Sequence, residues 1–180
     1  PPNHISSSMV ILLNFETEKK WVGFCSYREL WGKEKNIQNR HSINSLLNSV
    51  PEEWKEYDAI IGEPTILHRP KLVKYLKHGK MAVLNNFKEM FNSKQSIKFH
   101  FDMFHGTGNL DKAIKLLPKE DMYEFNDFVR NNTSFNQGNM FISKSSKIIN
   151  QYFSVVFNWL ERCEKIFGFN LRGYNKIRIY

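Results

Sequence analysis

The chain has 180 residues, with 26 Lys and Arg against 18 Asp and Glu, so its formal net charge is +8. Hydrophobic residues make up 41% and aromatic residues 14% of the sequence, which is enough apolar surface to fold and excludes intrinsic disorder. The longest apolar run, Met9–Leu13, is far shorter than the roughly 20 residues of a membrane-spanning helix.

The first part of the chain is predicted to form short strands and two helices. Apolar runs at residues 9–15, 21–25 and 57–62 have the length of buried strands. Apolar residues at helical spacing predict a helix over residues 43–50, and Pro70 suits the first turn of another helix. Strands and helices therefore alternate along this part.

The second part of the chain is predicted to be mainly helical. The expected helices cover residues 85–102, 111–117, 121–129 and 145–167, with a loop at 105–109, a strand at 138–143 and Gly168 ending the last helix. Because the strands are apolar throughout, we expect helices to cover the sheet on both faces. The expected architecture is one α/β domain over residues 1–180.

The cysteines and the charge bear on compartment and partners. Cys25 and Cys163 lie far apart and form no CxxC pair, so two free thiols in a reducing compartment are expected. A positive net charge attracts nucleic acid, an anionic membrane surface or a phosphorylated small molecule. The basic residues run from Lys19 to Arg178 without a block of five or six, which disfavours nucleic acid.

Several motifs of known chemistry are absent from the sequence. It contains no Gly-x-Gly-x-x-Gly, no Walker loop, no Gly-x-Ser-x-Gly and no His-Glu-x-x-His, and its Cys and His residues lack zinc spacing. Most nucleotide-hydrolysing and zinc-dependent classes lose support on this evidence.

One candidate site follows the predicted strand at residues 21–25. Tyr27 and Arg28 come directly after it, and ligands of open α/β sheets bind outside the ends of strands. Arginine can bind a phosphate with two parallel hydrogen bonds, and tyrosine can stack on a base or a sugar. The alternative is that Arg28 and Glu29 form an ordinary surface ion pair.

A second candidate site is the segment at residues 100–106. His100, Asp102 and His105 could act as acid and base or bind phosphate, next to a loop that contains glycine. The alternative is an amphipathic segment whose phenylalanines enter the core while its polar residues face water. No known ligand spacing supports a metal site here.

A third candidate site surrounds the start of the strand at residues 138–143. The amides of Asn136, Gln137 and Asn139 supply paired donors and acceptors that suit sugar hydroxyls. Alternatively, asparagine and glycine here only form a turn. Two charged stretches, Asp111-Lys112 and residues 161–165, are interpreted as solvated helix faces rather than sites.

The candidate segments resemble a known family. Residues 22–28 (Val-Gly-Phe-Cys-Ser-Tyr-Arg) resemble the "VGxxHYRR" segment of bacterial glycosyltransferase-like domains catalogued as a domain of unknown function (DUF4422). Further similar stretches are residues 100–106 and 109–114, residues 135–142 beside the family's "FNPxNMFI", and residues 159–164 and 178–180, the last at the start of its "RIYGFLAER". Ser26 and Glu29 depart from the His and the second Arg of the family pattern.

The resemblance implies the GT-A-like fold of nucleotide-diphospho-sugar transferases, in which helices flank a central sheet. The fold is expected to be incomplete at both ends of this chain. The resemblance implies the transfer of a sugar from a nucleoside-diphosphate donor to a surface polysaccharide or oligosaccharide acceptor, as in capsule or lipopolysaccharide synthesis. A UDP-sugar is the expected donor. The expected partners are nucleotide-sugar and glycan, without nucleic acid. The expected location is the cytoplasm, with peripheral association at the inner membrane. The start at Pro1 and the stop at Tyr180 are taken as signs of a fragment.

The resemblance also suggests roles for the candidate residues. Arg28 would stabilise the leaving diphosphate, and Asp102 would act as general base or contact the donor sugar. The expected phosphate contacts are Tyr27, Arg28, His100 and His105, and the expected sugar contacts are Asn136, Gln137 and Asn139. The chain has no Asp-x-Asp motif, so its dependence on Mn²⁺ or Mg²⁺ stays open. The main alternative is a non-catalytic carbohydrate-binding or assembly module, and a nucleic-acid-binding domain is a third.

Overall fold

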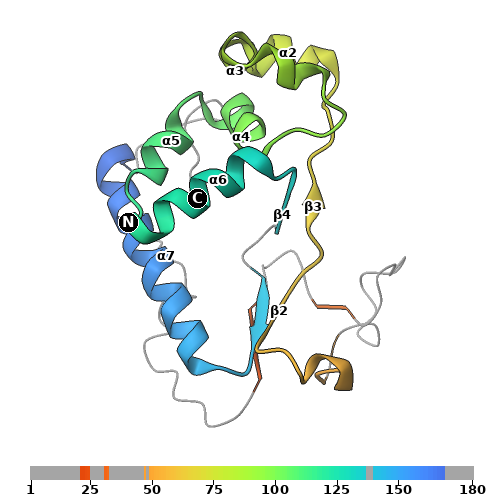
Figure 1. Ribbon diagram of the computed structural model, residues 1–180, viewed down its shortest axis with the longest axis vertical. Coiled ribbons are helices and arrows are strands. Elements are labelled where there is room, and N and C mark those ends of the chain that lie inside the picture. Colours follow the sequence, from red (N-terminus) through yellow and green to blue (C-terminus); the bar gives the residue numbers. More distant parts are fainter. Residues whose placement is uncertain (1–20, 25–30, 33–46, 48, 137–139, 169–180) are drawn as a thin grey trace, which may run out of the picture. The chain divides into compact units, whose positions relative to one another are not determined.

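A computed structural model describes residues 21–24, 31–32, 47, 49–136 and 140–168. The chain divides into two compact units, which are described separately below (Figure 1). Unit 1 consists of Pro1–Glu63 and Asn136–Ser154, and unit 2 consists of Pro64–Phe135 and Val155–Tyr180. The described residues form strands and helices of a mixed α/β structure, which confirms the predicted class at that level.

Unit 1 contains a three-stranded antiparallel sheet. Strand β5 (Phe141–Ser143) lies between β1 (Val22–Phe24) and β2 (Ala59–Ile61). A short 3-10 helix, η2 (Glu52–Trp54), precedes β2, and the first turns of α7 (Ser146–Phe167) follow β5. Strands β1 and β2 lie within the strands predicted at 21–25 and 57–62, respectively.

Aromatic rings form the core of unit 1. Phe141 on β5 packs against Phe24 on β1 at 4.8 Å between ring centroids, and against Phe153 on α7 at 5.7 Å. Tyr152 adds an edge-on contact with Phe141 at 5.1 Å. Aromatic pairs at these separations stabilise a structure beyond their buried area, which helps a small sheet to hold its helix.

The sheet differs from its prediction in one respect. All of β5 is buried, but Ile61 on the edge strand β2 is 63% exposed. Antiparallel sheets tolerate a solvated face, so the prediction of coverage on both faces is wrong for β2 in the described part.

Of the helix predicted at 43–50, the described residues 47, 49 and 50 are not helical, and the predicted strand 9–15 lies outside the described residues.

Unit 2 is mainly helical. Its elements are strands β3 (Thr65–Ile66) and β4 (Ser134–Phe135), which pair antiparallel, and helices α2 (Leu72–His78), α3 (Lys80–Asn85), η3 (Phe87–Phe91), α4 (Ile97–His105), α5 (Asn109–Ile114), α6 (Lys119–Asn131) and the rest of α7. No helix of the described residues is long and apolar enough to cross a membrane. The helix predicted at 145–167 is confirmed as α7, and Gly168 after it has φ of 71°.

Two hydrophobic clusters hold the helices of unit 2 together. Tyr75, Ala82, Phe99 and Met103 join α2, α3 and α4. The second cluster joins α5 to α6 through Leu110, Ile114 and Val129. Helix α7 is attached by Trp159, whose indole Nε1 donates to the backbone oxygen of Ala113 at 2.7 Å and whose ring contacts Phe125.

The helix predicted over residues 85–102 is split into three pieces. Helix α3 ends at Asn85, η3 follows, and α4 begins only at Ile97. Ser96 starts α4 because its Oγ accepts the backbone N–H of Phe99 at 3.2 Å, which is a typical N-cap bond. This cap fixes the start of α4 at Ile97, within the range predicted as one continuous helix.

Candidate functional site

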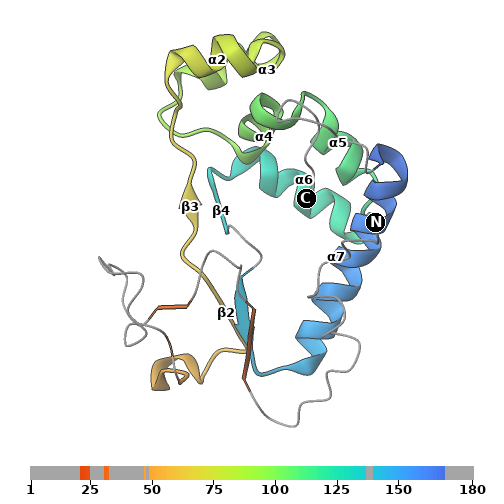
Figure 2. The same ribbon diagram turned by 180° about the vertical axis from the view of Figure 1, so that it is seen from behind.

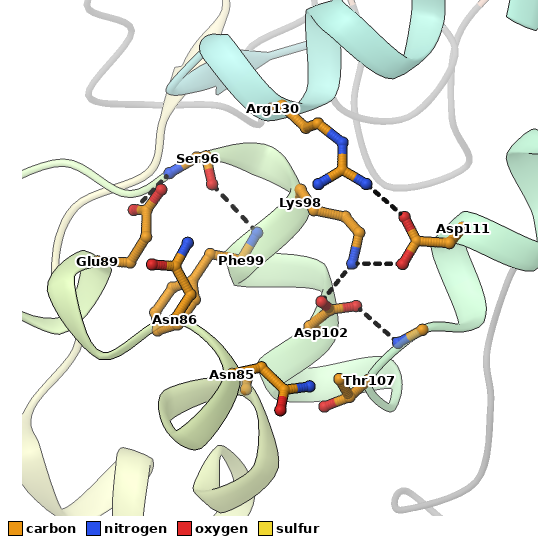
Figure 3. Close-up of a pocket in the computed structure, with 12 residues that line it drawn as sticks. Asn85, Asn86, Glu89, Ser96, Lys98, Phe99, Asp102, Thr107, Asp111 and Arg130 are labelled. Atoms are coloured by element: carbon orange, nitrogen blue, oxygen red, sulfur yellow. Dashed lines mark hydrogen bonds and ion pairs between the residues drawn. The ribbon is translucent and has the colours of Figure 1, made fainter.

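A pocket of about 350 Å³ lies within unit 2 (Figure 3). Its lining residues come from α3, η3, α4, the loop after α4, α5 and α6: Ala82, Asn85, Asn86, Glu89, Ser96, Lys98, Phe99, Asp102, Thr107, Gly108, Asp111 and Arg130. The volume lies within the usual range for a small-molecule site. Most of the lining side chains are polar, so a polar ligand suits it best.

A chain of ion pairs forms one wall of the pocket. Lys98 is only 8% exposed, and its Nζ contacts carboxylate oxygens of Asp102 and of Asp111, the latter at 3.0 Å. The other oxygen of Asp111 accepts from Nη2 of Arg130 at 2.8 Å. Lys98 and Asp102 meet because they lie four residues apart on α4. The packing of α4 with α5 and α6 adds the other two residues, so the four charges form one network.

The loop between α4 and α5 fixes the second oxygen of Asp102. Its Oδ1 accepts the backbone N–H of Gly108 at 3.2 Å, while its Oδ2 faces Lys98. Gly106 and Gly108 have φ of 93° and 82°, values that residues with a side chain rarely adopt. Glycine at both positions therefore allows the chain to turn back and present the N–H.

We expect Gly106→Ala to lower the free energy of unfolding by about 2–3 kcal/mol, from backbone strain and a lost hydrogen bond. An added Cβ would lie 2.5 Å from Nδ2 of Asn109, which donates to the backbone oxygen of His105. Gly108→Ala is the matched control: it has a similar φ but open space, so about 1–2 kcal/mol is expected. Urea unfolding measures both, and equal losses would show that the clash with Asn109 does not matter.

The opposite wall offers polar groups to a ligand. Glu89 accepts the backbone N–H of Ser96 at 3.3 Å, which holds η3 against the start of α4. Among the residues that the structure describes, the side chains of Asn85, Asn86 and Thr107 make no hydrogen bond with the rest of the protein. Two amides and a hydroxyl are therefore available to a ligand as donors and acceptors.

The charge of the pocket favours a neutral ligand. Three carboxylates, from Glu89, Asp102 and Asp111, face two cations, Lys98 and Arg130, and both cations already pair with carboxylates. A phosphate would have to compete with these carboxylates. A polyhydroxylated ligand can instead donate to the remaining lone pairs of the carboxylates and accept from the amides.

The pocket does not fit a divalent metal ion. The ammonium of Lys98 lies between Asp102 and Asp111, where a cation that bridged both carboxylates would have to sit. Within the described ranges, no group of three or more His, Cys, Asp or Glu side chains is arranged to hold a metal.

The three predicted site residues on α4 do not face the same place. Asp102 lines the pocket, but His100 and His105 do not. At about 100° per residue, His100 and Asp102 lie on opposite sides of the helix. His100 packs against Phe104 at 4.8 Å between ring centroids, and His105 packs against Phe101 at 4.6 Å. The roles predicted for the two histidines at a phosphate stay predictions.

Half-buried His100 is held in its neutral form. Burial lowers the pKa of its imidazole below 6.5, and the nearby His105 and Lys74 lower it further. Its Nδ1 is buried and makes no hydrogen bond with the described part of the chain. A neutral imidazole of this kind cannot supply positive charge to a phosphate near neutral pH.

The lowered pKa of His100 predicts a loss of stability in acid. Between the folded pKa and 6.5 the unfolded chain binds the proton more tightly, so the free energy of unfolding falls as the pH drops through this window. His100→Gln should flatten the stability profile between about pH 7 and pH 5, measured by urea unfolding at each pH. An unchanged slope in His100→Gln would contradict the assignment.

The other predicted residues fall elsewhere. Asn136 does not line the pocket, and its Oδ1 is buried without a hydrogen bond to the described residues. Tyr27, Arg28, Gln137 and Asn139 lie outside the described residues, so their roles stay predictions. The strand before Arg28 pairs antiparallel, so the rule for open α/β sheets that suggested its site does not apply here.

One interpretation from the sequence is corrected. Asp111, expected on a solvated helix face, lines the pocket and pairs with Lys98 and Arg130. Its neighbour Lys112 is exposed, as expected. Lys98, Arg130, Asn85, Asn86 and Thr107 were not predicted as site residues at all. The spacing of Lys98 and Asp102, followed by two glycines, was the one signal in the sequence that could have revealed this pocket.

Comparison with known proteins gives a family. The family described as "Domain of unknown function (DUF4422)" matches residues 11–180, a span that includes every residue of the pocket. No curated protein and no solved structure matches the chain. Because the match covers far more than half of the sequence, the chain belongs to the DUF4422 family.

Proposed function

We propose that this chain is a glycosyltransferase with a GT-A-like arrangement. It moves a sugar from a nucleoside diphosphate, with UDP as the first candidate, to a hydroxyl of a glycan acceptor. The pocket of unit 2 is its sugar subsite. The observation that carries the proposal is a pocket in which two carboxylates pair with a buried lysine, beside amide and hydroxyl groups that have no partner in the described part.

The contacts of the pocket suit a neutral sugar ring. Asp102 and Asp111 each keep lone pairs that can accept from sugar hydroxyls, and Asn85 and Asn86 can both donate and accept. Phe99 and Ala82, which belong to the core below, also line the pocket. An acidic sugar would meet three carboxylates, so we expect a preference for uncharged hexoses.

The transfer itself needs two further functions. The bond from the anomeric carbon to the diphosphate breaks, the diphosphate leaves with the electron pair, and the acceptor oxygen forms the new bond as its proton passes to a base. Arg28 is proposed to stabilise the leaving diphosphate, on the ground of the resemblance of residues 22–28 to the family pattern alone. Asp102 is proposed to hold the sugar or to take the proton. With nucleotide-sugar as donor, we expect the activity in the cytoplasm.

Ligand-induced thermal stabilisation tests this function against the alternative of a carbohydrate-binding module. A transferase should be stabilised by UDP and more strongly by at least one UDP-hexose; a ligand at 100 times its Kd adds about 2.7 kcal/mol. Asp111→Asn should reduce the extra effect of the sugar but keep that of UDP. Stabilisation by free saccharides without any response to UDP would instead indicate the binding module and overturn the proposal.

A further inference from the structure

The segment at residues 69–94, which contains α2, α3 and η3, exposes an unusual amount of apolar surface. Of the fourteen exposed large hydrophobic residues of the described chain, seven lie in this segment. They are Leu72, Val73, Leu76, Met81, Leu84, Phe87 and Phe91, with exposed fractions from 57% to 74%. Figure 2 shows α2 and α3 next to each other at one end of unit 2. Apolar patches of this kind mark contact surfaces.

The fold does not need these side chains. Tyr75 on α2 and Ala82 on α3 are each 3% exposed and supply the contacts with α4. Leu72 and Leu76 on the same helix are 66% and 69% exposed, so they take no part in this core. The helices therefore have one apolar side in the core of unit 2 and a second apolar side without a partner in the described chain.

The same segment carries most of the net charge of the protein. It contains seven Lys and Arg residues and one acidic residue, Glu89, so its formal charge is +6 out of the chain's +8. Its lysines at positions 71, 74, 77, 80, 88 and 94 are all exposed. Glu89, whose charge is included in this sum, accepts the backbone N–H of Ser96. Exposed leucine and phenylalanine thus alternate with lysine over one short stretch.

We propose that the segment at residues 69–94 docks onto the surface of an anionic phospholipid membrane. Leucine and phenylalanine side chains would enter the boundary of the acyl chains, while the lysine stems reach back to the lipid phosphates. Charge decides between the possible occupants. A second copy of this chain would bring two surfaces of +6 together, and a nucleic acid would leave seven large apolar side chains without a use.

The docking surface adjoins the pocket. Ala82, Asn85, Asn86 and Glu89 line the pocket from α3, the residue after it and η3, while Met81 and Leu84 of the same stretch are exposed. A membrane bound to this segment would therefore lie near the pocket. The proposed membrane docking follows from the exposed apolar side chains and the positive charge of this segment. It does not depend on whether the chain transfers sugars.

Vesicle sedimentation tests the docking. The full chain is mixed, without any sugar donor, with vesicles of phosphatidylcholine or of phosphatidylcholine with phosphatidylglycerol. We expect binding to the phosphatidylglycerol vesicles only, and a loss of binding as salt approaches about 1 M, where charges are screened within ~3 Å. Absence of binding to the anionic vesicles would overturn the proposal.

Two triple variants separate the apolar and the charged contributions. Leu72→Gln with Leu76→Gln and Leu84→Gln should weaken the partitioning about tenfold or more, because each buries apolar area in the bilayer. Lys71→Gln with Lys77→Gln and Lys80→Gln should weaken it about fivefold per lysine. All six side chains are exposed and none has an ion pair or hydrogen bond within the described part, so both variants should keep the parent melting temperature.

Matched controls use other exposed residues of unit 2. Tyr123→Gln with Ile166→Gln changes apolar residues that are 72% and 63% exposed, and Lys112→Gln with Lys115→Gln and Lys119→Gln removes the same charge elsewhere. Both controls should bind vesicles as the parent does, and equal losses would overturn the proposal. A dimer that the leucine variant dissociates, or equal binding to a DNA duplex, would also overturn it, in favour of self-association or nucleic-acid binding.

Discussion

Lys98→Met should lower the free energy of unfolding by about 3–5 kcal/mol, the usual cost of removing one partner of a buried ion pair. Lys98 is 8% exposed, and the side chain of Asp102 is 11% exposed. Methionine fills a similar volume, so the loss comes from a carboxylate left without its counter-charge in a poorly solvated place. Urea unfolding of the parent and the variant measures the difference.

A matched pair on α7 provides the control for Lys98. Glu161 and Lys165 are also four residues apart and lie 2.7 Å from each other, but both are well exposed. Lys165→Met should therefore cost far less, because exposed ion pairs contribute little. In addition, Lys98→Met combined with Asp102→Asn should cost less than the sum of the two single changes. Additive losses, or equal losses at Lys98 and Lys165, would show that the buried network does not hold the pocket.

Asp102→Asn should lower kcat/KM for sugar transfer by about 100-fold or more, the scale expected when a base or a charged contact is lost. The substitution keeps the size of the side chain and an oxygen that can accept from Gly108. Lys98 retains its second partner, Asp111, at 3.0 Å. The variant should therefore stay folded and lose mainly transition-state contacts, which turnover with a UDP-sugar measures.

Asp127→Asn is the control for this loss. Asp127 is exposed on α6, accepts from Asn131 at 2.7 Å and does not line the pocket. Its turnover should match that of the parent. A fall in kcat/KM that is the same for Asp127→Asn and Asp102→Asn would mean that the pocket has no special part in the reaction.

The long helix was the most predictable element of the fold. Its apolar residues repeat over many turns, and the predicted bounds 145–167 differ from α7 by one residue. The helix predicted over 85–102 failed because local contacts decided its boundaries. The cap at Ser96 and the 3-10 turns of η3 depend on single hydrogen bonds, which hydrophobic periodicity does not show.

The site was predicted only in part, for a similar reason. His100, Asp102 and His105 are close in sequence, but an α-helix separates neighbours and joins residues three or four apart. Asp102 therefore meets Lys98, four residues before it, while Asp111 and Arg130 reach the pocket through the packing of α5 and α6. A charged residue on a helix looks solvated in the sequence until the helix that covers it is known.

The distribution of charge shows the same limit. The basic residues look scattered along the whole sequence, yet the segment at residues 69–94 holds a net +6 together with half of the exposed large apolar residues of the described chain. Periodicity predicts that a helix such as α2 has an apolar side. It does not predict that Tyr75 enters the core while Leu72, Val73 and Leu76 stay exposed.

Turnover of nucleotide-sugars is the most direct test of the proposed function. The full chain is incubated with a panel of UDP-hexoses and oligosaccharide acceptors, with and without Mn²⁺, and the released UDP and the mass of the acceptor are measured. We predict UDP release with at least one uncharged hexose donor, an acceptor heavier by one sugar residue, and about 100-fold less of both in Asp102→Asn. If no donor released UDP and no UDP-sugar bound to the chain, the proposed glycosyltransferase activity would be contradicted.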